Sequence, residues 1–354
     1  MNSLEDVGFQ RSVDPEGMID RINEAPRQIR DAWATVSKFT LPSDFVSVEQ
    51  LDEVLVLGMG GSAIGADLVA GLVAPAVRVP IWTHRSYRLP GWVDENTLVI
   101  ASSYSGNTEE TLSGWTEAGQ RGVPRLAVTT GGQLVSDAGG APLLSFEYNS
   151  QPRAALGHSL TLILGVLWKA GLLPDPAAEI GRASRLLETA CREWQPEVPT
   201  EENLAKRLAA WFAAGLPVIF GADHLSAVAR RWTTQINENS KGWAFWAEMP
   251  ELNHNVVVGF EHPRGIAEAA RVIALLSPSY AERITARFEI TGQLMDEAGA
   301  AWLPVVAEGQ GRLEEMLWTI YLGDFVSYYL AILHNVDPTP VEPIQRLKAR
   351  LAER

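Results

Sequence analysis

A glycine-rich turn that ends in Ser62 contains the first residues able to do chemistry. It follows a short apolar run, Glu53–Leu57, and precedes apolar residues at helical spacing over Ala63–Leu72. A strand that passes through glycines into a helix presents bare backbone amides and a helix N-terminus, which together bind anions and phosphate in particular. Gly60 and Gly61 would let a phosphate approach the backbone closely, and Ser62 would cap the helix and donate its hydroxyl to a phosphate oxygen.

This turn is close to the dinucleotide-binding pattern without matching it. The chain reads G-x-G-x-x-x-x-G from Gly58, whereas the dinucleotide fingerprint is G-x-G-x-x-G. The fingerprint also needs an acidic residue about 20 residues further along to bind the ribose. His84 and Arg85 stand at the end of the next predicted strand instead. The residues favour a phosphate site, with a nicotinamide-dependent oxidoreductase and a purely structural turn as alternatives.

A second turn, within Ala101–Thr111, is rich in hydroxyl side chains. It also follows a predicted strand and opens a predicted helix. Ser103, Ser105 and Thr108, together with amides at the helix start, would form a neutral cradle for phosphate. The alternative is ordinary helix capping by Asn107 or Thr108, with acidic residues behind it. A cap needs one such residue, so the three hydroxyls favour the cradle.

These two turns, of the forms G-G-S and S-x-S-G-N-T, resemble the phosphate loops of sugar isomerase (SIS) domains. Further segments, in the same order along the chain, resemble the bifunctional phosphoglucose/phosphomannose isomerase family and cover most of the sequence. They are Pro152-Arg153, Gln235–Lys241 (QINENSK), Pro250–His254 (PELNH) and Asp337–Lys348 (DPTPVEPIQRLK). The resemblance implies an enzyme that interconverts glucose 6-phosphate, and mannose 6-phosphate as well, with fructose 6-phosphate. It implies no metal and no other cofactor.

The resemblance assigns a residue to each task of aldose–ketose isomerisation. Glu238 would move the proton between C2 and C1. His254 would open the sugar ring, since the ordinary pKa of a histidine, near neutrality, suits that exchange. Lys348 would assist at the ring oxygen, and Arg153 would stabilise the enediolate. The two turns would anchor the substrate phosphate through Gly60, Gly61, Ser62, Ser103, Ser105 and Thr108.

Glu238 and His254 have competitors in the sequence. Glu248 and Glu251 are carboxylates of the same region, and spacing alone does not separate them from Glu238. Without the resemblance, Glu238 would pass for a solvated surface acid. The remaining histidines are expected to be structural. In related isomerases the ring-opening histidine comes from the partner subunit, so the resemblance implies a homodimer with His254 contributed across its interface.

Acceptance of mannose 6-phosphate in the family is associated with a threonine near the tail lysine. Thr339 is the only threonine available there, nine residues before Lys348, whereas ungapped spacing would put Val341 at that position. The expectation that the enzyme also accepts mannose 6-phosphate therefore depends on which residue occupies this position, whereas the expectation of isomerase activity does not. Trp243 and Trp246 are expected to pack in the core rather than to shape the pocket.

A non-catalytic, sugar-phosphate-binding SIS protein is the alternative from a different functional class. It would keep the hydroxyl anchors but would lack a base and a histidine that converge on one ligand. Such a regulator usually has an additional DNA-binding or effector domain. The two expected domains account for the 354 residues of the sequence, so no stretch is expected to form such an additional domain.

Composition and charge narrow the class further. Of the residues, 46% are hydrophobic and 20% charged, which is typical of a globular protein with enough material for two cores. The formal net charge of −14 argues against general nucleic-acid binding, so an anionic substrate must be attracted by local features. The single cysteine, Cys191, is expected to be a buried thiol, and no metal-ligand set is visible. With no signal peptide and no long apolar run, we expect a cytoplasmic protein without a membrane partner.

The elements that must position these residues alternate between short apolar runs and helices. This pattern predicts an α/β fold of two doubly wound parallel-sheet, SIS-like domains with helices on both faces. The expected division is an N-terminal SIS domain with the phosphate loops (1–155), a helical connection (156–200) and a C-terminal SIS domain with the catalytic Glu and His and the C-terminal helix (201–354). Strands are predicted at Glu53–Leu57, Val79–Trp82, Thr97–Ser102, Leu126–Thr129, Leu143–Phe146, Leu216–Gly221, Asn255–Gly259, Arg271–Ser277 and Trp302–Ala307. Helices are predicted over Met18–Val48, Ala63–Leu72, Thr108–Ala118, Leu156–Trp194, Ser226–Ile236, Leu313–Leu333 and Pro343–Leu351.

Overall fold

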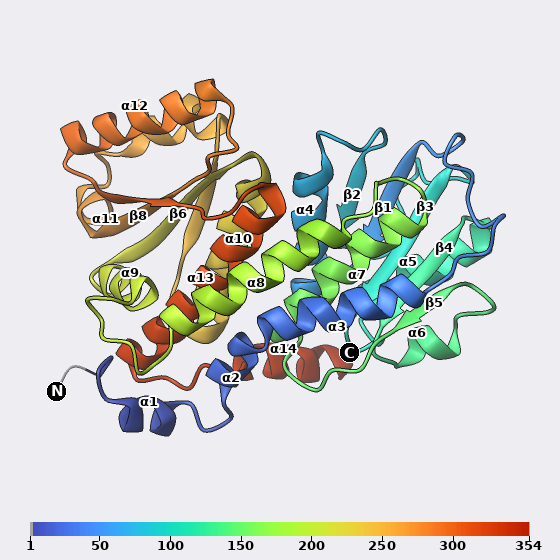
Figure 1. The fold of residues 1–354 in the computed structure, drawn as a ribbon, viewed down its shortest axis with the longest axis horizontal. Helices are drawn as coiled ribbons and strands as arrows, with labels where there is room; N and C mark the ends of the chain where they lie inside the picture. The colour runs from blue at the N-terminus through green and yellow to red at the C-terminus, as the bar shows by residue number, and fades with distance from the viewer. Residues whose placement is uncertain (1–2, 354) are drawn as a thin grey trace. The chain divides into compact units, whose positions relative to one another are not determined.

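The computed structural model describes residues 3–353, which form two compact units (Figure 1). The five-stranded unit comprises Glu24–Glu188 together with Gly309–Leu317. The four-stranded unit comprises the rest of the described chain, namely the residues up to Asn23, Thr189–Glu308 and the residues from Trp318 onward. Each unit is thus built from separate stretches of sequence. The expected linear division into 1–155, 156–200 and 201–354 stays a prediction.

The five-stranded unit contains one parallel sheet. Its strands are β1 (Glu53–Leu57), β2 (Ile81–His84), β3 (Thr97–Ser103), β4 (Arg125–Thr129) and β5 (Leu143–Ser145). Their order is β2-β1-β3-β4-β5, and every neighbouring pair is parallel. β1 pairs with β3 so that Leu57 lies opposite Ala101. The chain adds β2 on one side of β1 and then β3 on the other side. The direction in which strands are added to the sheet therefore reverses at β1.

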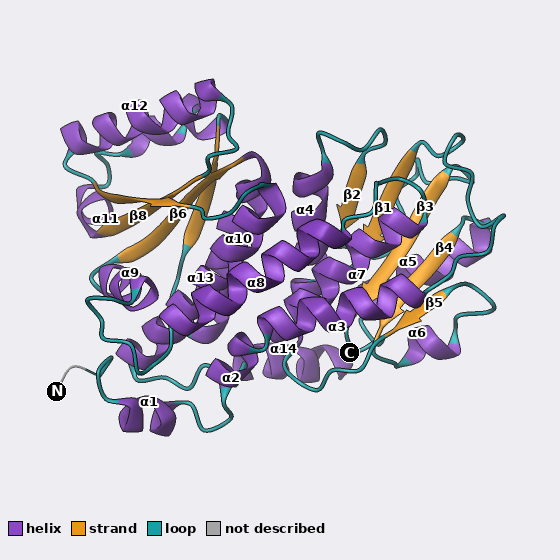
Figure 2. Ribbon diagram, in the orientation of Figure 1, coloured by secondary structure: helices purple, strands orange, loops and turns teal. Residues whose placement is uncertain are grey.

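Helices cover both faces of this sheet (Figure 2). They are α3 (Ala25–Lys38), α4 (Gly60–Val73), α5 (Glu109–Arg121), α6 (Gln133–Ser136) and α7 (Leu156–Lys169). Because side chains alternate along a strand, Leu55 and Leu57 share one face, where they form a buried core with Val99 of β3 and Ala118 of α5. α4 packs against β1, β3 and α7, and α3 packs against α7.

The four-stranded unit repeats this plan with fewer strands. Its strands are β6 (Leu216–Ala222), β7 (Phe245–Met249), β8 (Ala270–Leu276) and β9 (Ala301–Val306), all parallel in the order β7-β6-β8-β9. α10 (Ser226–Asn239) packs on β6 and β7, and α12 (Glu282–Ala298) contacts β7, β8 and β9. The other helices with residues in this unit are α1 (Val7–Val13), α2 (Met18–Asn23), α8 (Ala177–Glu193), α9 (Leu204–Ala213), α11 (Arg264–Ala269), α13 (Arg312–His334) and α14 (Glu342–Ala352).

The predicted fold class is confirmed, because both sheets are parallel and helices cover both faces. One strand prediction is wrong. Val256–Gly259 forms a short 3-10 helix, η4, which starts where the Asn255 side chain accepts the Val256 N–H at 2.7 Å. The strand of that region is β7, which was not predicted. The helix predicted over Met18–Val48 is α2 and α3 and ends at Lys38, and the helix predicted over Leu156–Trp194 is α7 and α8.

α13 is the long apolar helix predicted near the C-terminus. Within the described chain it is the one helix with the length and composition to cross a membrane, and 94% of its most apolar window is buried in the fold. Such burial is typical of the core helix of a folded domain. Cys191 is also buried, as predicted.

Candidate active site

The glycine-rich and hydroxyl-rich turns both lie at the carboxyl edge of the five-stranded sheet. One follows β1 and the other follows β3, which is its hydrogen-bonded neighbour. In doubly wound sheets, ligands bind in the crevice where the strand order reverses, and β1 is the strand at that position. The two turns are close in space, since a Cβ built on Gly58 would lie 3.0 Å from the Ser102 carbonyl oxygen.

The first turn presents an uncapped helix start. α4 begins at Gly60, with Met59 as its extended N-cap residue, and no described side chain caps the helix. The N–H groups of a first helical turn have no partner within the helix, so a bound anion can accept from them. The prediction that Ser62 caps this helix is wrong: Ser62 is its third residue, with its N–H on the Met59 carbonyl at 3.1 Å.

The second turn gathers hydroxyl groups. The Ser103 and Thr108 hydroxyl oxygens are 3.0 Å apart, and Ser103 Oγ also accepts the Gly106 N–H at 3.1 Å. Ser105 Oγ is exposed and accepts the Asn107 N–H at 3.2 Å. Thr108 occupies the N-cap position of α5, but among the described contacts its side chain caps nothing. The hydroxyls of Ser103 and Thr108 are therefore grouped, as in the predicted cradle, whereas the described contact of Ser105 is within its own turn.

Gly106 is the residue that lets this turn close. Its φ is +66°, and a Cβ at this position would lie 1.8 Å from the Gly131 carbonyl oxygen. Any other residue would have to displace the backbone of the turn after β4. The glycine of the S-x-S-G-N-T motif is thus required by the geometry that holds Ser103 and Thr108 together.

Arg153 lies beside the first turn, on the short 3-10 helix η1 (Pro152–Ala155). A Cβ built on Gly61 would lie 3.0 Å from the Pro152 carbonyl oxygen and 3.5 Å from the Arg153 Cα, so the two backbones meet directly. Arg153 itself is buried, at 3% exposure. The backbone of an arginine, whose guanidinium is always charged, therefore lies next to the predicted phosphate turn.

His158 follows Arg153 at the start of α7 and is enclosed by aromatic rings. Its ring centroid lies 5.1 Å from that of Phe146 and 4.9 Å from that of Tyr148. Burial lowers the pKa of His158 to about 4, so its imidazole is neutral at physiological pH. Because its protonated form is scarcely populated at neutral pH, His158 does not supply a positive charge to the nearby turn.

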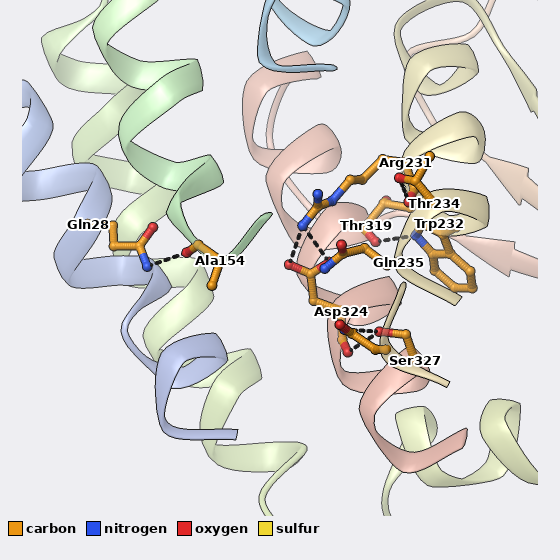
Figure 3. A network of polar contacts seen from close by, with 10 residues as sticks. Gln28, Ala154, Arg231, Trp232, Thr234, Gln235, Thr319, Asp324 and Ser327 are labelled. Carbon is orange, nitrogen blue, oxygen red and sulfur yellow. Dashed lines mark hydrogen bonds and ion pairs between the residues drawn. The ribbon is translucent and has the colours of Figure 1, made fainter. Parts of the chain in front are cut away.

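Glu238 lies on the last turn of α10 and is half-buried. The helix is held against α13 by buried polar contacts, shown in Figure 3. Arg231 forms an ion pair with Asp324 at 3.2 Å, Gln235 Nε2 donates to the same carboxylate at 2.8 Å, and Trp232 Nε1 donates to the Thr319 carbonyl at 2.8 Å. These contacts fix the rotation of α10 about its axis, and with it the direction of Glu238.

Glu238 lines a cavity of about 980 Å³ in the four-stranded unit. Lys241 lines it too, and its Nζ donates to the Glu238 carbonyl at 2.5 Å and to the Pro338 carbonyl at 3.2 Å. Lys241 thus connects the segment around Pro338 to the end of α10. The remaining lining residues are Asn237, Gly242, Trp243, Ala244, Phe245, Val336, Asp337, Pro340, Val341, Glu342, Pro343 and Ile344.

The other predicted residues are distributed around this unit. Glu248 on β7 and Glu251 on the 3-10 helix η3 (Glu251–His254) are exposed, and neither is among the described residues that line the cavity. His254 ends η3 and is exposed, and Lys348 is exposed on α14. The first turn of α14 lines the cavity with Glu238, whereas His254 and Lys348 are absent from the described lining.

The two specificity candidates differ in their position. Val341 lines the cavity that contains Glu238. Thr339 is 4% exposed and is not among the described lining residues; its N–H donates to Asp337 Oδ1 at 2.8 Å. The structure also places Trp243 in the cavity wall with 78% exposure, and Trp246 is exposed at 38%. The expectation that these two tryptophans pack in the core is therefore wrong.

Sequence reasoning gave no role to two residues that shape these sites. Lys241 belongs to the QINENSK segment but was not assigned, although a positively charged residue just after a helix commonly binds the last carbonyls of that helix. Tyr104 lies inside the second turn, and its hydroxyl bonds to the segment that precedes Arg153. In the described part of the chain, no group of three or more His, Cys, Asp or Glu side chains is arranged to hold a metal ion.

Comparison with known proteins agrees with this geometry. Residues 201–351 match the model of the bacterial phospho-glucose isomerase C-terminal SIS domain. A bifunctional phosphoglucose/phosphomannose isomerase from Caldicellulosiruptor bescii is 39% identical over 339 residues, covering 95% of this chain and 99% of that protein. A protein of the same name from Aquifex aeolicus is 32% identical over 301 residues, covering 84% and 90%.

The fold is similar to that of solved structures as well. A hypothetical protein from Thermus thermophilus superposes with a TM-score of 0.74 over 98% of this chain and 94% of that one. The sequence identity is 17%, so this similarity concerns the fold alone.

Proposed function

This chain belongs to the bifunctional phosphoglucose/phosphomannose isomerase family, and we propose that it interconverts glucose 6-phosphate and mannose 6-phosphate with fructose 6-phosphate. The observation that supports this most is the 39% identity to such an isomerase along 95% of the chain. The hydroxyl-rich turn beside β1, at the position where doubly wound sheets bind ligands, supports a phosphorylated substrate.

We propose that the substrate phosphate binds at the two turns of the five-stranded unit. Backbone amides at the start of α4 and the hydroxyls of Ser62, Ser103, Ser105 and Thr108 supply its donors. Gly60 and Gly61 keep the backbone accessible to it. Backbone amides at a helix N-terminus and neutral hydroxyls are donors that bind a phosphate dianion.

The proton transfer is assigned to Glu238. As a carboxylate it removes the proton from C2 of the open-chain aldose, which gives the enediolate with its charge on O1. The O2 proton then moves to O1, and the carboxylic acid returns its proton to C1, which leaves C2 as the carbonyl of the ketose. Arg153 stabilises the negative charge that develops on the enediolate oxygens. The contact between its backbone and Gly61 supports this role, since it holds Arg153 beside the first turn.

Ring opening is assigned to His254 and Lys348. His254 exchanges a proton with the sugar as the C1–O5 bond breaks, and Lys348 assists at the ring oxygen. Both side chains are exposed, so both are accessible to a substrate. The four proposed groups, those of Glu238, Arg153, His254 and Lys348, act by proton transfer or by electrostatic stabilisation. The proposed reaction accordingly uses no metal or cofactor.

The test uses the purified chain treated with EDTA. Fructose 6-phosphate formation is measured from glucose 6-phosphate and, separately, from mannose 6-phosphate. Formation from both supports the proposal, and formation from glucose 6-phosphate alone contradicts dual specificity. Binding of a hexose 6-phosphate with no turnover of either would identify the protein as the non-catalytic sugar-phosphate binder instead.

We propose position 341 as the specificity position, in preference to Thr339. Val341 lines the cavity with Glu238, and valine and threonine have nearly the same volume, so the cavity stays as wide as a threonine would leave it. Val341→Met should therefore lower kcat/KM for mannose 6-phosphate more than for glucose 6-phosphate. Thr339→Val should change the ratio little; the reverse pattern would return the role to Thr339.

We further propose that the enzyme is a cytoplasmic homodimer. Large apolar side chains are exposed in the same unit as His254, including Trp243 at 78%, Phe245 at 50% and Val258 at 83%. Exposed apolar side chains of this size are typical of a surface covered by another protein chain. Phosphorylated hexoses are charged and do not cross membranes unaided, which supports the cytoplasmic location. Sedimentation equilibrium across a concentration range tests the dimer.

A further inference from the structure

The side chain of Tyr104 holds the segment from Tyr148 to Arg153 to the second phosphate turn. We propose that Tyr104 is a positioning residue: its hydroxyl fixes this segment, and thereby Arg153, relative to Ser103 and Ser105. The inference rests on the proposed function, because it assumes that the turn binds the substrate phosphate and that Arg153 acts on the enediolate.

The Tyr104 hydroxyl makes two contacts with the segment. It donates to the Tyr148 carbonyl oxygen, and it accepts the Ser150 N–H at 3.0 Å. The Tyr104 ring is held at its edge by Phe146, with 6.3 Å between the ring centroids. Tyr104 stands between Ser103 and Ser105 in the sequence, so its backbone is part of the phosphate turn. Its hydroxyl is hydrogen-bonded to the segment that precedes Arg153.

The same segment is held on its other side by α3. Gln28 Nε2 donates to the Ala154 carbonyl oxygen, as Figure 3 shows, and to the Tyr148 hydroxyl, both at 2.8 Å. The Tyr148 hydroxyl in turn donates to Glu24 Oε2 at 2.7 Å. With Gly61 packed on Pro152, the Arg153 segment is thus fixed to both phosphate turns and to α3.

The backbone of Tyr104 is held by Thr130, independently of the Tyr104 hydroxyl. The roles of the backbone and of the hydroxyl can therefore be tested separately. Thr130 donates to the Tyr104 carbonyl oxygen through its N–H at 3.2 Å and through Oγ1 at 2.6 Å. This anchor holds the phosphate turn whether or not the Tyr104 hydroxyl is present. Removing the hydroxyl should therefore release the Arg153 segment and leave the turn in place, whereas weakening the Thr130 anchor should disturb the turn.

Phosphate binding and enediolate stabilisation can be measured separately. Glucitol 6-phosphate, which has no carbonyl, reports on the phosphate turn. A five-carbon aldonate 5-phosphate, whose planar carboxylate imitates the enediolate, reports on Arg153 as well. A small displacement of a catalytic group is costly, so Tyr104→Phe should lower kcat about 10- to 100-fold and weaken the aldonate to a similar extent. The Kd of glucitol 6-phosphate should stay within about twofold, as neutral contacts that are retained change little.

Thr130→Val is the matched control. It should weaken both ligands together and raise KM, while the ratio of the two Kd values stays that of the wild type. Circular dichroism and thermal melts of each variant confirm that the compared proteins are folded.

A double-mutant cycle decides whether Tyr104 acts through Arg153. In an Arg153→Gln background, Tyr104→Phe should lower kcat by less than about twofold, because the group that it positions is already absent. A full and additive loss in that background, or an unchanged kcat for Tyr104→Phe alone, would overturn the proposal. An inactive wild type that still binds glucitol 6-phosphate would instead count against the isomerase function, and the two ligand affinities would still test Tyr104.

Discussion

The surroundings of Ser103 decide what its hydroxyl can do. Its oxygen already accepts the Gly106 N–H, and the Thr108 hydroxyl is 3.0 Å away. A serine hydroxyl has one proton to donate and two lone pairs. Either hydroxyl of the Ser103–Thr108 pair can be the donor. With Thr108 donating, the proton of Ser103 is left for an external acceptor, which in the proposed function is a phosphate oxygen.

Ser103→Ala is expected to weaken substrate binding more than turnover. Loss of one hydrogen bond to a charged acceptor costs about 1.5–3 kcal/mol, so KM and the Kd of glucitol 6-phosphate should rise about 10- to 100-fold. Ser113→Ala, a serine of α5 away from its N-terminus, is the control. Equal Kd values for Ser103→Ala and the wild type would place the phosphate elsewhere.

Glu238→Gln should lower kcat by about 10²- to 10⁴-fold, because an amide cannot accept the C2 proton. Steady-state kinetics in both directions measures the effect. The matched control is Glu248→Gln, which changes an exposed carboxylate outside the described cavity lining. A near-normal rate for Glu238→Gln, with a loss in Glu248→Gln, would transfer the role to Glu248.

At the residue scale, sequence patterns predicted which residues lie together, but they did not predict the local backbone geometry of each residue. The grouping of Ser103 and Thr108 was predicted from their excess over what a cap needs. The capping role given to Ser62 was wrong, because α4 starts at Gly60 and takes Ser62 into its first turn. Where a helix starts depends on backbone torsions such as the positive φ of Gly60, which residue types alone do not determine.

At the scale of elements, α10 shows how a catalytic candidate is directed by contacts it does not make itself. Arg231 and Gln235 lie one turn apart on the face of α10 that meets Asp324 of α13. His334 Nδ1 bonds to the Ser240 carbonyl oxygen at 2.9 Å, which fixes the end of the helix as well. Glu238 projects from a helix that is held along its length.

The strand error is also an element-scale effect. The run Val256–Gly259 is rich in β-branched residues, which favours a strand, but the Asn255 side chain accepts the following N–H and starts a turn. β7 was missed because its side chains are mostly exposed and it pairs with β6 alone in the described sheet. Edge strands of this kind lack the alternation that marks a half-buried strand.

His158 makes the stability of the α7 region dependent on pH. Its pKa is lowered to about 4 in the folded protein from an ordinary 6.5, so between these values the unfolded chain binds more protons. The stability is therefore complete above about pH 6.5 and is lost as the pH falls toward 4, by about 3 kcal/mol.

His158→Phe should remove this part of the pH dependence. Urea unfolding at pH 7 and at pH 5 measures it, and the difference between the two free energies of unfolding should be smaller in the variant. The aromatic contacts with Phe146 and Tyr148 are retained by phenylalanine. An unchanged difference would show that other groups titrate in this range.

At the scale of the whole molecule, the net charge of −14 opposes an anionic substrate. Local donors have to overcome this field, and in the proposed function the two turns and Arg153 are those donors. The sequence predicted the class of this fold because alternating strands and helices leave few topologies. It did not predict that Gly309–Leu317 joins the five-stranded unit, since a contact between distant segments has no local signature.

A mixing experiment tests whether His254 serves the partner subunit. Glu238→Gln and His254→Asn should each be nearly inactive alone. After joint unfolding and refolding, half of the dimers are mixed and each has one intact site, so about a quarter of the wild-type activity should return. A mixture that stays inactive although dimers have formed would show that both residues act within one subunit.

The interrupted path of the five-stranded unit has a consequence for biosynthesis. Its last segment, Gly309–Leu317, leaves the ribosome only after the whole of Thr189–Glu308 has been translated. All strands from β1 to β5 are therefore made before the second sheet, but the unit that contains them lacks this segment until the second sheet has been translated. Expression of a gene fragment that stops after Glu188 would omit the start of α13, whose Arg312 donates to the Gly71 carbonyl of α4 at 3.1 Å. This gene cannot be divided into two independent cloning units by a single cut.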